Sequence, residues 1–398
     1  MRISTANSYQ TSLDTLVNRH AELTGTQQQL TTGKRVNRAS DDPAAAARAE
    51  RALASERRTV ANQRAVDASN NSMALTEGAL GDASGLLQDV RDLLVAAGNA
   101  TYSDAERATV ANELSQIRQQ LFAVANRNDG AGTHLFGGQG AAQPPFADLP
   151  GGVQFQGTSG QLQVASGEPL PLTMDGESTW MQARSGNGVF ETRAVTSTGT
   201  AWVDTGSVTN PSLVTGSTYS MQFTVAAGVT TYSVLQDGLP TAQTNVSFTP
   251  GQAIQINGQS VTVKGQPANG DAFEMAPSSA SLSVFDAIDQ AIADLKAPGR
   301  SNTQNTQANA INLNNVDQVL NQVLAGRTAI GATMNRIDGV TGRLSALALA
   351  SKTERSNAED IDITQAISDF SNQQTGYDAA LKAYSMVQRL SLFNYLNV

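Results

Sequence analysis

The chain has no cysteine, so neither a disulfide framework nor a thiolate metal site is possible. Charged residues make up only 15% and aromatic residues only 5% of its 398 residues. Small and polar residues take their place, chiefly Ala, Ser, Thr, Gln and Asn. This composition is compatible with packed helices, but it predicts a thin hydrophobic core for the length of the chain.

Long apolar runs are also missing. The first ten residues, MRISTANSYQ, contain no apolar core, so we expect no signal peptide of the usual kind. No run of about 18 apolar residues occurs, so we expect no membrane-spanning helix and no membrane partner. If the protein is exported, it must use a route that does not depend on a cleaved signal peptide.

Basic residues are scarce in the centre of the chain. The net charge is −9, and residues 141–280 carry 3 basic and 9 acidic residues, whereas the flanking regions are nearly balanced. Nucleic-acid-binding proteins concentrate positive charge on one surface. An acidic centre without a basic cluster therefore argues against nucleic acid as a partner.

Apolar stripes with heptad spacing occur near both ends of the chain, and this spacing is typical of helices that pack side by side. The first stripe consists of Tyr9, Leu13, Leu16, His20, Leu23, Gln27 and Leu30. The second consists of Leu313, Val316, Leu320, Val323, Arg327, Ile330, Met334, Ile337, Thr341, Leu344 and Ala348. The third consists of Ile363, Ile367, Phe370, Gln374, Tyr377, Leu381 and Tyr384.

Between the first stripe and the next helix lies the segment LTTGKRVNRASDDPAAAARAE, residues 30–50. Gly33 is a helix-ending residue. Asp42 can cap a new helix that has Pro43 at its first position. We expect this helix to continue towards LLQDVRDLLVAAGNA (86–100), with a candidate break near the glycines at 78, 81 and 85. Ser103 with Glu106 predicts a capping box for the next helix.

The centre of the chain predicts β structure. YSMQFTV (219–225) alternates apolar and polar residues, and TYSVL follows after a short turn, as in a hairpin. AIQINGQSVTVKG predicts a second hairpin with Asn257-Gly258 at its turn, and NGDAFEM predicts one more strand. Helix returns from about residue 284 and stops at Pro298-Gly299, and a polar linker then leads to Leu313.

The predicted fold is therefore mostly α with a β insertion. Long N- and C-terminal helices pair in a coiled coil or helical bundle, and a central β-rich domain faces outward. Joining the two ends closes a very long loop, whose entropic cost grows only logarithmically with length. The predicted parts are an N-terminal helix (1–42), the two halves of a helical bundle (43–140 and 281–355), a β-rich domain (141–280) and a C-terminal helix (356–398).

Chemical sites are hard to find in this sequence. His20 lies on a helical stripe and His134 has no second ligand nearby, so we expect packed or hydrogen-bonded roles for both. Asp41 and Asp42 could form a metal or catalytic pair, but capping before Pro43 is the simpler interpretation. TGKR lacks the remainder of a P-loop motif, and the two tryptophans are expected to be anchors in the core or on the surface. We predict no catalytic, cofactor or metal site.

Polar residues dilute the heptad stripes, at His20, Gln27, Arg327, Thr341 and Gln374. The terminal segments therefore contain too little Leu and Ile to be stable alone. An intramolecular bundle remains an alternative, but we expect residues 1–42 to be disordered in the free subunit and to fold on meeting other copies.

With these motifs the chain resembles the flagellin superfamily. LTTGKRVNRASDDPAAAA resembles the family's helix joint, and EDIDITQAISDFSNQQTGYDAALKAYSMVQRLSLFNYL resembles its terminal helix. The weaker motifs THLFGG and NGDAFEM resemble the junction proteins of the superfamily more than its filament flagellins. The resemblance covers about the first 140 and the last 120 residues.

The resemblance implies an extracellular structural subunit of the bacterial flagellum, located between hook and filament and exported through the flagellar type III apparatus. It implies as partners further copies of the chain, a hook-side junction protein, filament flagellin, and an export chaperone on the C-terminal helix. The implied interface residues are Tyr9, Leu13, Leu16, His20, Leu23, Leu30, Ile363, Ile367, Phe370, Tyr377, Leu381 and Tyr384. The implied joint consists of Gly33, Arg35, Asn37, Asp41, Asp42 and Pro43.

Three alternatives stay open at this point. The chain could be the filament flagellin itself, or a secreted coiled-coil adhesin that shares the flagellin ends. An enzyme inserted in the variable centre is a third alternative, which the absence of a nucleophile–base or metal-ligand cluster argues against.

Overall fold

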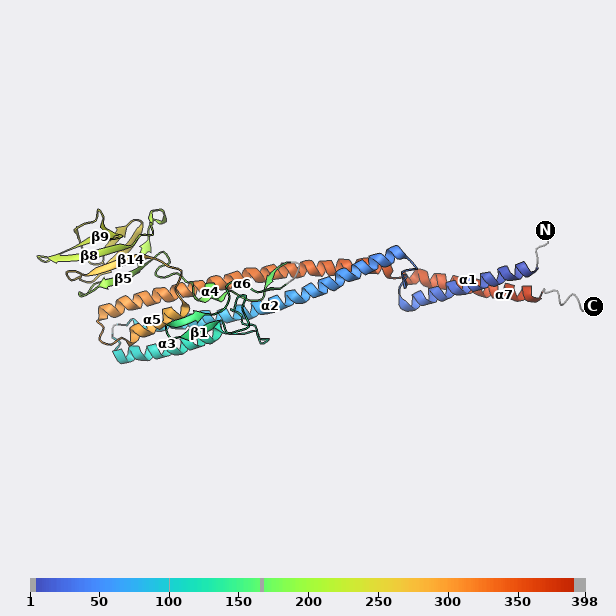
Figure 1. Ribbon diagram of the computed structural model, residues 1–398, viewed down its shortest axis with the longest axis horizontal. Helices are drawn as coiled ribbons and strands as arrows, with labels where there is room; N and C mark the ends of the chain where they lie inside the picture. Colours follow the sequence, from blue (N-terminus) through green and yellow to red (C-terminus); the bar gives the residue numbers. More distant parts are fainter. Residues whose placement is uncertain (1–4, 100, 165–167, 390–398) are drawn as a thin grey trace, which may run out of the picture. The chain divides into compact units, whose positions relative to one another are not determined.

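The computed structural model describes residues 5–99, 101–164 and 168–389 (Figure 1). The chain divides into two compact units. One unit comprises residues 1–64 and 340–398, and the other comprises residues 65–339. Two long helices, α2 (Pro43–Ala97) and α6 (Asn302–Glu359), contribute to both units. The predicted fold class, long terminal helices with a β-rich centre, is confirmed.

The first unit consists of two helix pairs. Helices α1 (Thr5–Thr32) and α7 (Ile363–Arg389) contact each other along their length. The beginning of α2 packs on the end of α6, where the Ser351 hydroxyl donates to Ser55 Oγ (3.0 Å) and Arg355 lies 3.4 Å from a Glu56 carboxylate oxygen. None of the helices in the described residues is long and apolar enough to cross a membrane.

In the second unit, α3 (Asp104–Ala125) and α5 (Val284–Lys296) contact each other. Arg91 of α2 pairs with Asp317 of α6 at 2.8 Å. Arg327, a polar residue on a predicted core position, forms an ion pair with Glu77 of α2. The pair explains how a charged residue is accommodated on the heptad stripe, because the opposite charge compensates it where the helices meet.

An aromatic cluster joins the helices of this unit to the chain that follows α3. Trp180, at the end of the short helix α4 (Gly176–Trp180), is fully buried and stacks on Phe285 of α5 with ring centroids 6.0 Å apart. Phe136 meets Trp180 edge-on at 5.3 Å. Two small two-stranded sheets belong to the same region: β1 (Phe146–Leu149) with β2 (Gly152–Phe155), and β3 (Gln163–Val164) with β4 (Leu170–Pro171).

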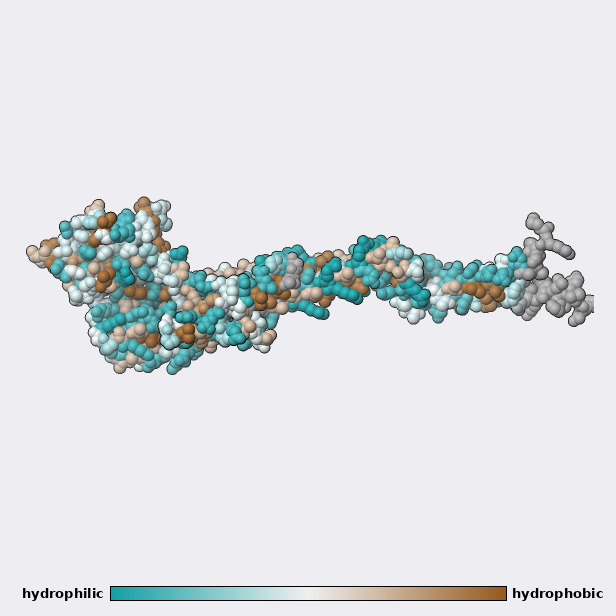
Figure 2. Space-filling view, viewed as in Figure 1, coloured by the Kyte–Doolittle hydropathy of each residue, from teal (hydrophilic) through white to brown (hydrophobic). Residues whose placement is uncertain are grey.

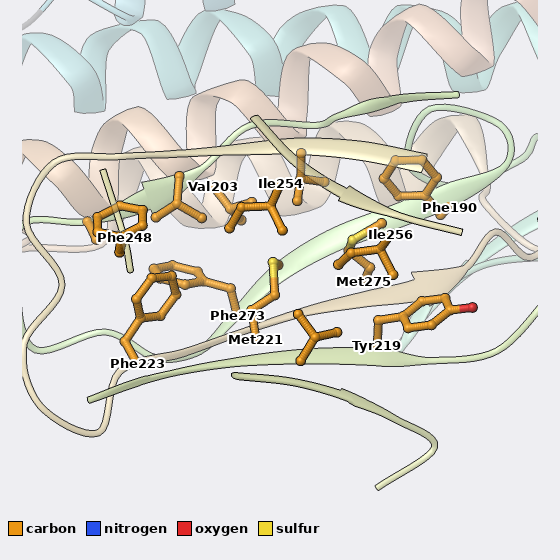
Figure 3. Close-up of a cluster of buried hydrophobic side chains, with 14 residues drawn as sticks. Phe190, Val203, Tyr219, Met221, Phe223, Phe248, Ile254, Ile256, Phe273 and Met275 are labelled. Atoms are coloured by element: carbon orange, nitrogen blue, oxygen red, sulfur yellow. The ribbon is translucent and has the colours of Figure 1, made fainter. Parts of the chain in front are cut away.

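A β-sandwich forms the rest of the centre. The larger sheet has the antiparallel order β10-β9-β8-β14-β5, with β11 also paired to β9, and the smaller has the order β12-β13-β6, with β7 also paired to β13. Their facing side chains form one buried cluster that includes Phe223, Phe273 and Val203 (Figure 3). The strands are β5 (Phe190–Thr196), β6 (Trp202–Val203), β7 (Ser207–Val208), β8 (Tyr219–Ala226), β9 (Val229–Gln236), β10 (Leu239–Pro240), β11 (Val246–Ser247), β12 (Ala253–Ile256), β13 (Gln259–Lys264) and β14 (Ala272–Pro277), and a 3₁₀ turn covers Pro211–Leu213.

Both predicted hairpins are present. β12 and β13 pair across Asn257 (φ 43°) and Gly258 (φ 77°), and positive φ at both central residues is the type I′ requirement. The β8–β9 hairpin turns through Ala227 (φ 49°) and Gly228 (φ 79°) in the same way. The cluster of the sandwich begins at Phe190, so the earlier part of the predicted domain, which contains Trp180, packs with the helices instead.

Two local predictions were wrong. Helix α2 continues through Gly78, Gly81 and Gly85 without a break. The predicted polar linker before Leu313 is helical, because α6 begins at Asn302.

The polar start of α6 is stabilised by specific hydrogen bonds. Ser301 Oγ accepts from the Gln304 N–H (3.2 Å), and Gln304 Oε1 accepts from the Ser301 N–H (2.9 Å), which is a capping box that the Ser-x-x-Gln spacing could have revealed. The buried Gln307 accepts from the Val203 N–H (2.7 Å), and the buried Asn312 donates to Asp294 (3.0 Å). These polar residues therefore make contacts with the β-sandwich and α5.

The predicted capping box at the start of α3 is confirmed, with Ser103 and Glu106 bonded reciprocally. We expect Ser103→Ala to lower the free energy of unfolding by about 1 kcal/mol, because an N–H in the first turn loses its acceptor. Denaturant unfolding of the purified chain measures this change. Ser115→Ala, in the middle of the same helix, is the control and should be neutral. An equal loss in both variants would contradict the capping role.

Candidate assembly site: the terminal helix pair and its joint

The terminal helices run antiparallel and bring the two ends of the chain together. The hydroxyl groups of Tyr9 and Tyr384 are hydrogen-bonded at 2.6 Å, and their rings lie 5.5 Å apart. The rings of His20 and Tyr377 also lie 5.5 Å apart. Residues more than 350 positions apart in the sequence therefore meet, as the matching heptad stripes indicate.

The pair does not bury its whole apolar stripe. Ile363 is 61% exposed and Ile367 is 56% exposed, whereas Ala366 beside them is buried. Val17 of α1 is exposed as well. Figure 2 shows hydrophobic residues gathered on the visible surface of the terminal helices. Of the other predicted interface residues, Tyr9, His20 and Leu381 are exposed, and the half-buried ones are Leu13, Leu16, Leu23, Leu30, Phe370, Tyr377 and Tyr384.

The geometry of a helix pair explains why some residues of the apolar stripe are covered and others are exposed. One partner helix covers only one side of its neighbour, and the apolar stripe of α7 is wider than that side. Ile363, Ile367 and Leu381 repeat at steps of four and fourteen residues, so they share a face of α7. This face is an exposed apolar surface of α7.

The joint after α1 is bonded to a second joint before α7. Gly33 has φ 71° and ends α1, and its carbonyl accepts from the Ile361 N–H (3.1 Å). The Glu359 carbonyl accepts from the N–H groups of Arg35 (2.7 Å) and Val36 (3.3 Å). The breaks between α1 and α2 and between α6 and α7 therefore form a single hydrogen-bonded unit.

Side chains reinforce the double joint. The Arg35 guanidinium donates to the Ala358 carbonyl (3.0 Å) and to Asp42 Oδ2 (3.2 Å). Lys34 forms an ion pair with Glu359 at 3.1 Å. Arg35 is thus the residue that connects the N-terminal cap to the C-terminal break.

The two acids of the joint act on backbone N–H groups. Asp41 Oδ2 accepts from Asn37 (3.0 Å) and Arg38 (2.8 Å), which closes the turn. Asp42 Oδ1 accepts from Ala45 (3.0 Å), and α2 begins at Pro43. The Ala45 N–H and the Arg35 guanidinium hold the pKa of Asp42 below its usual value. The geometry is that of capping and does not support a metal or catalytic pair.

Sequence reasoning identified the N-terminal half of the joint and missed its C-terminal half. Asp362 caps α7 by accepting from the N–H groups of Thr364 (2.9 Å) and Gln365 (3.1 Å). The Asp-x-x-Gln spacing before an apolar stripe is a signal that could have located this cap. The contact of Lys34 with Glu359 spans more than 300 residues and leaves no local signal.

The remaining candidate residues have structural contacts. His134 Nδ1 lies 3.2 Å from the Ala141 carbonyl oxygen. Trp180 is a core residue. The Lys264 ammonium nitrogen lies over the ring of Trp202, 4.9 Å from the ring centroid. No group of three or more His, Asp or Glu side chains within the described ranges is placed to hold a metal ion.

Family models match both helical ends of the chain. Residues 3–141 match the bacterial flagellin N-terminal helical region, and residues 313–396 match the bacterial flagellin C-terminal helical region. Together they cover more than half of the chain. This chain belongs to the bacterial flagellin family. Membership places the protein in the bacterial flagellum, in a family of structural flagellar proteins.

The relatives that align with most of this chain are flagellar hook-associated or junction proteins. The chain is 26% identical to the flagellar hook-associated protein 3 of Salmonella typhimurium over 99% of both chains. Among solved structures, it is 27% identical to the flagellar junction protein FlgL of Legionella pneumophila, with a TM-score of 0.65 over 70% of this chain and 94% of that one. FlgL of Xanthomonas campestris is 28% identical, with a TM-score of 0.68 over 77% of this chain and 99% of that one.

Proposed function

We propose that this chain is the structural subunit that joins the flagellar hook to the filament, and that copies assemble through α1 and α7. The observation that carries the proposal is the exposed apolar face of α7, with Ile363, Ile367 and Leu381, on the helix pair that α7 forms with α1. Its support is the similarity to hook-associated protein 3 over nearly the whole chain.

The energetics favour assembly of many copies over pairing within one. Fixing the backbone of one residue costs about 1–2 kcal/mol, and one helix partner leaves Ile363 and Ile367 largely in water. Burying an isoleucine fully contributes about 1.5–3 kcal/mol. The terminal helices are therefore weakly stable in a free subunit and become stable when neighbouring copies cover the exposed face.

The joint gives this assembly a defined direction. The two breaks are bonded to each other through Gly33 and Glu359. The angle between α1 and α2 and the angle between α6 and α7 must therefore change together. Copies that share one joint geometry can repeat the same contacts around a layer.

The partners follow from this position. A hook-side junction protein contacts the layer on one side and filament flagellin contacts it on the other. The subunit is exported unfolded by the flagellar type III apparatus without a cleaved signal peptide, and it folds outside the cell. Before export, a chaperone covers the apolar face of the C-terminal helix α7 (Ile363–Arg389). The protein acts by assembly and not by catalysis.

A strain that lacks the gene tests the proposal. We expect bare hooks on the cells and soluble flagellin in the culture medium, because filament subunits have no layer on which to assemble. Electron microscopy of the cells and immunoblotting of the medium measure both results. Re-expression of the chain from a plasmid is the control and should restore filaments.

Other outcomes would reject it. Filaments of normal length would mean that another protein makes the junction. Intact hooks with no flagellin either on the cell or in the medium would indicate that this chain is itself the filament subunit, and abundance in sheared filaments would agree with that result.

A further inference from the structure

The three glycines in the middle of α2 have no explanation within the subunit. Glycine is the poorest helix former after proline, yet α2 continues through Gly78, Gly81 and Gly85. A Cβ atom at Gly78 or Gly85 would have no atom within 4 Å, and at Gly81 its nearest neighbour would be Arg327 Nη2 at 3.8 Å. The fold of one copy therefore has room for alanine at all three positions.

Two of these glycines line a surface groove between α2 and α3. Gly81 and Gly85 lie in it together with Asp82, Asp89 and Arg127. Asp82 pairs with Arg127 at 2.8 Å, whereas Asp89 is exposed and has no ion-pair partner in the described part of the chain. Without side chains at the glycines, the backbone of another helix can approach α2 closely, and the free carboxylate favours a partner that carries positive charge.

A helix face of that chemistry lies in the first half of α2. Alanines at 47, 54 and 61 repeat at heptad spacing and are exposed. Arg57, Arg58 and Arg64 stand beside them, also exposed, and none of the three makes an ion pair within the residues that the structure describes. The opposite side of this segment is buried. We call this surface the arginine–alanine face, and it is narrow and positively charged.

We propose that the arginine–alanine face of one copy docks in the glycine groove of a second copy. The charges are complementary and their spacing matches, because Arg57 and Arg64 are seven residues apart, as are Asp82 and Asp89. Seven residues of helix span about 10 Å, so when one arginine pairs with the free Asp89, the other can reach the Asp82 carboxylate and share it with Arg127. The inference rests on the proposed function, since it describes how copies of this subunit contact one another within the layer.

The contact is heterologous, because the face and the groove are different surfaces. A heterologous contact leaves one face and one groove free in every pair, so copies continue to add until a ring closes or a helix forms. This is the geometry that a layer around a tubular structure requires, and an isologous dimer could not provide it.

Substitutions at a groove glycine should change the assembly of copies without destabilising the fold of one copy. Gly85→Ala should leave the melting temperature of the purified chain unchanged or raise it, since alanine is the better helix former. Gly85→Leu should fill the groove and reduce the fraction of cells that carry filaments at least tenfold in the deletion strain. Gly342→Leu, at an exposed mid-helix glycine of α6 with equally open surroundings, is the matched control and should retain filaments. Normal filaments with Gly85→Leu would overturn the proposal.

Reversing the charges of Arg57, Arg64 and Asp89 tests whether the arginine–alanine face docks in the glycine groove. Arg57→Glu/Arg64→Glu and Asp89→Arg should each reduce filament retention at least tenfold, with export unchanged. Combining the three substitutions in one chain should restore at least part of it, because every copy carries both surfaces. Reversals that leave filaments intact, or a combined chain no better than either parent, would refute the docking. If the deletion strain itself retains filaments, the proposed function fails instead, so the two failures are distinguishable.

Discussion

A chain that carries Ile363→Asp and Ile367→Asp should be exported at the normal level and should fail to hold filaments on hooks. Both side chains are more than half exposed in the subunit, so the fold of one copy loses little, within about 0.5 kcal/mol per site. Ile363 is also the first residue of α7, where a negative charge suits the helix dipole. Monomer stability should therefore be preserved.

Assembly should respond much more strongly. Burying the exposed part of the two isoleucines, which is a little over half of each, contributes about 2–3.5 kcal/mol together, and burying an unpaired carboxylate adds a further penalty. Since about 1.4 kcal/mol corresponds to a factor of ten, the contact between copies should weaken by at least a hundredfold. Microscopy of the complemented deletion strain and immunoblots of exported protein measure both quantities.

Asn372→Asp is the matched control for this experiment. Asn372 is exposed, and its spacing of five and nine residues from the two isoleucines places it on the other side of α7. The substitution therefore introduces the same charge outside the apolar face, with almost no change in side-chain size. Filaments should be retained. If the isoleucine variant also retained filaments, the exposed apolar face would not be an assembly surface.

Gly33→Val should damage assembly more than it damages the subunit. Gly33 has φ 71°, a left-handed conformation that costs an L-residue about 1–2 kcal/mol and that β-branched residues avoid. A Cβ there would meet no atom within 4 Å, so the effect acts through the backbone alone. We expect the free energy of unfolding of the purified chain to fall by about 1–2 kcal/mol. We expect filament retention to fall at least tenfold, because α1 leaves the joint in another direction.

Gly33→Asn is the control, because asparagine tolerates the left-handed conformation. It should retain both stability and filaments. Replacing Asp41 and Asp42 together with alanine should reproduce the valine result, since the turn and the cap both lose their acceptors. Equal losses of folding and of assembly would show that the joint stabilises the subunit without directing assembly.

The joint shows how far local reasoning extends. Gly33, Asp42 and Pro43 were placed correctly from sequence because helix stops and caps depend on a few neighbouring residues. The bonds from Arg35 to Ala358 and from Lys34 to Glu359 could not be predicted, because they join segments that have no relation in the sequence. The same holds for α6, whose polar start is stabilised by Val203 and Asp294.

The heptad stripes illustrate a second limit. Periodicity predicted that α1 and α7 pair, and Tyr9 does meet Tyr384. It did not predict which stripe residues face the partner helix. The apolar stripe is wider than the surface that one helix can cover, so different residues of the stripe could be the buried ones. Only the structure shows that Ala366 is buried while Ile363 and Ile367 remain exposed.

The sequence by itself determined that both terminal regions are helical, the caps at Asp42 and Ser103, the two hairpin turns and the absence of thiol chemistry, because each depends on residue type and on spacing within one or two turns. Tertiary structure decided that the two helix breaks are bonded together, that the glycines of α2 lie in an unbroken helix beside a groove, and which apolar residues stay in water. These features depend on contacts between distant segments, and their free energies arise from burial and charge pairing that no local pattern records.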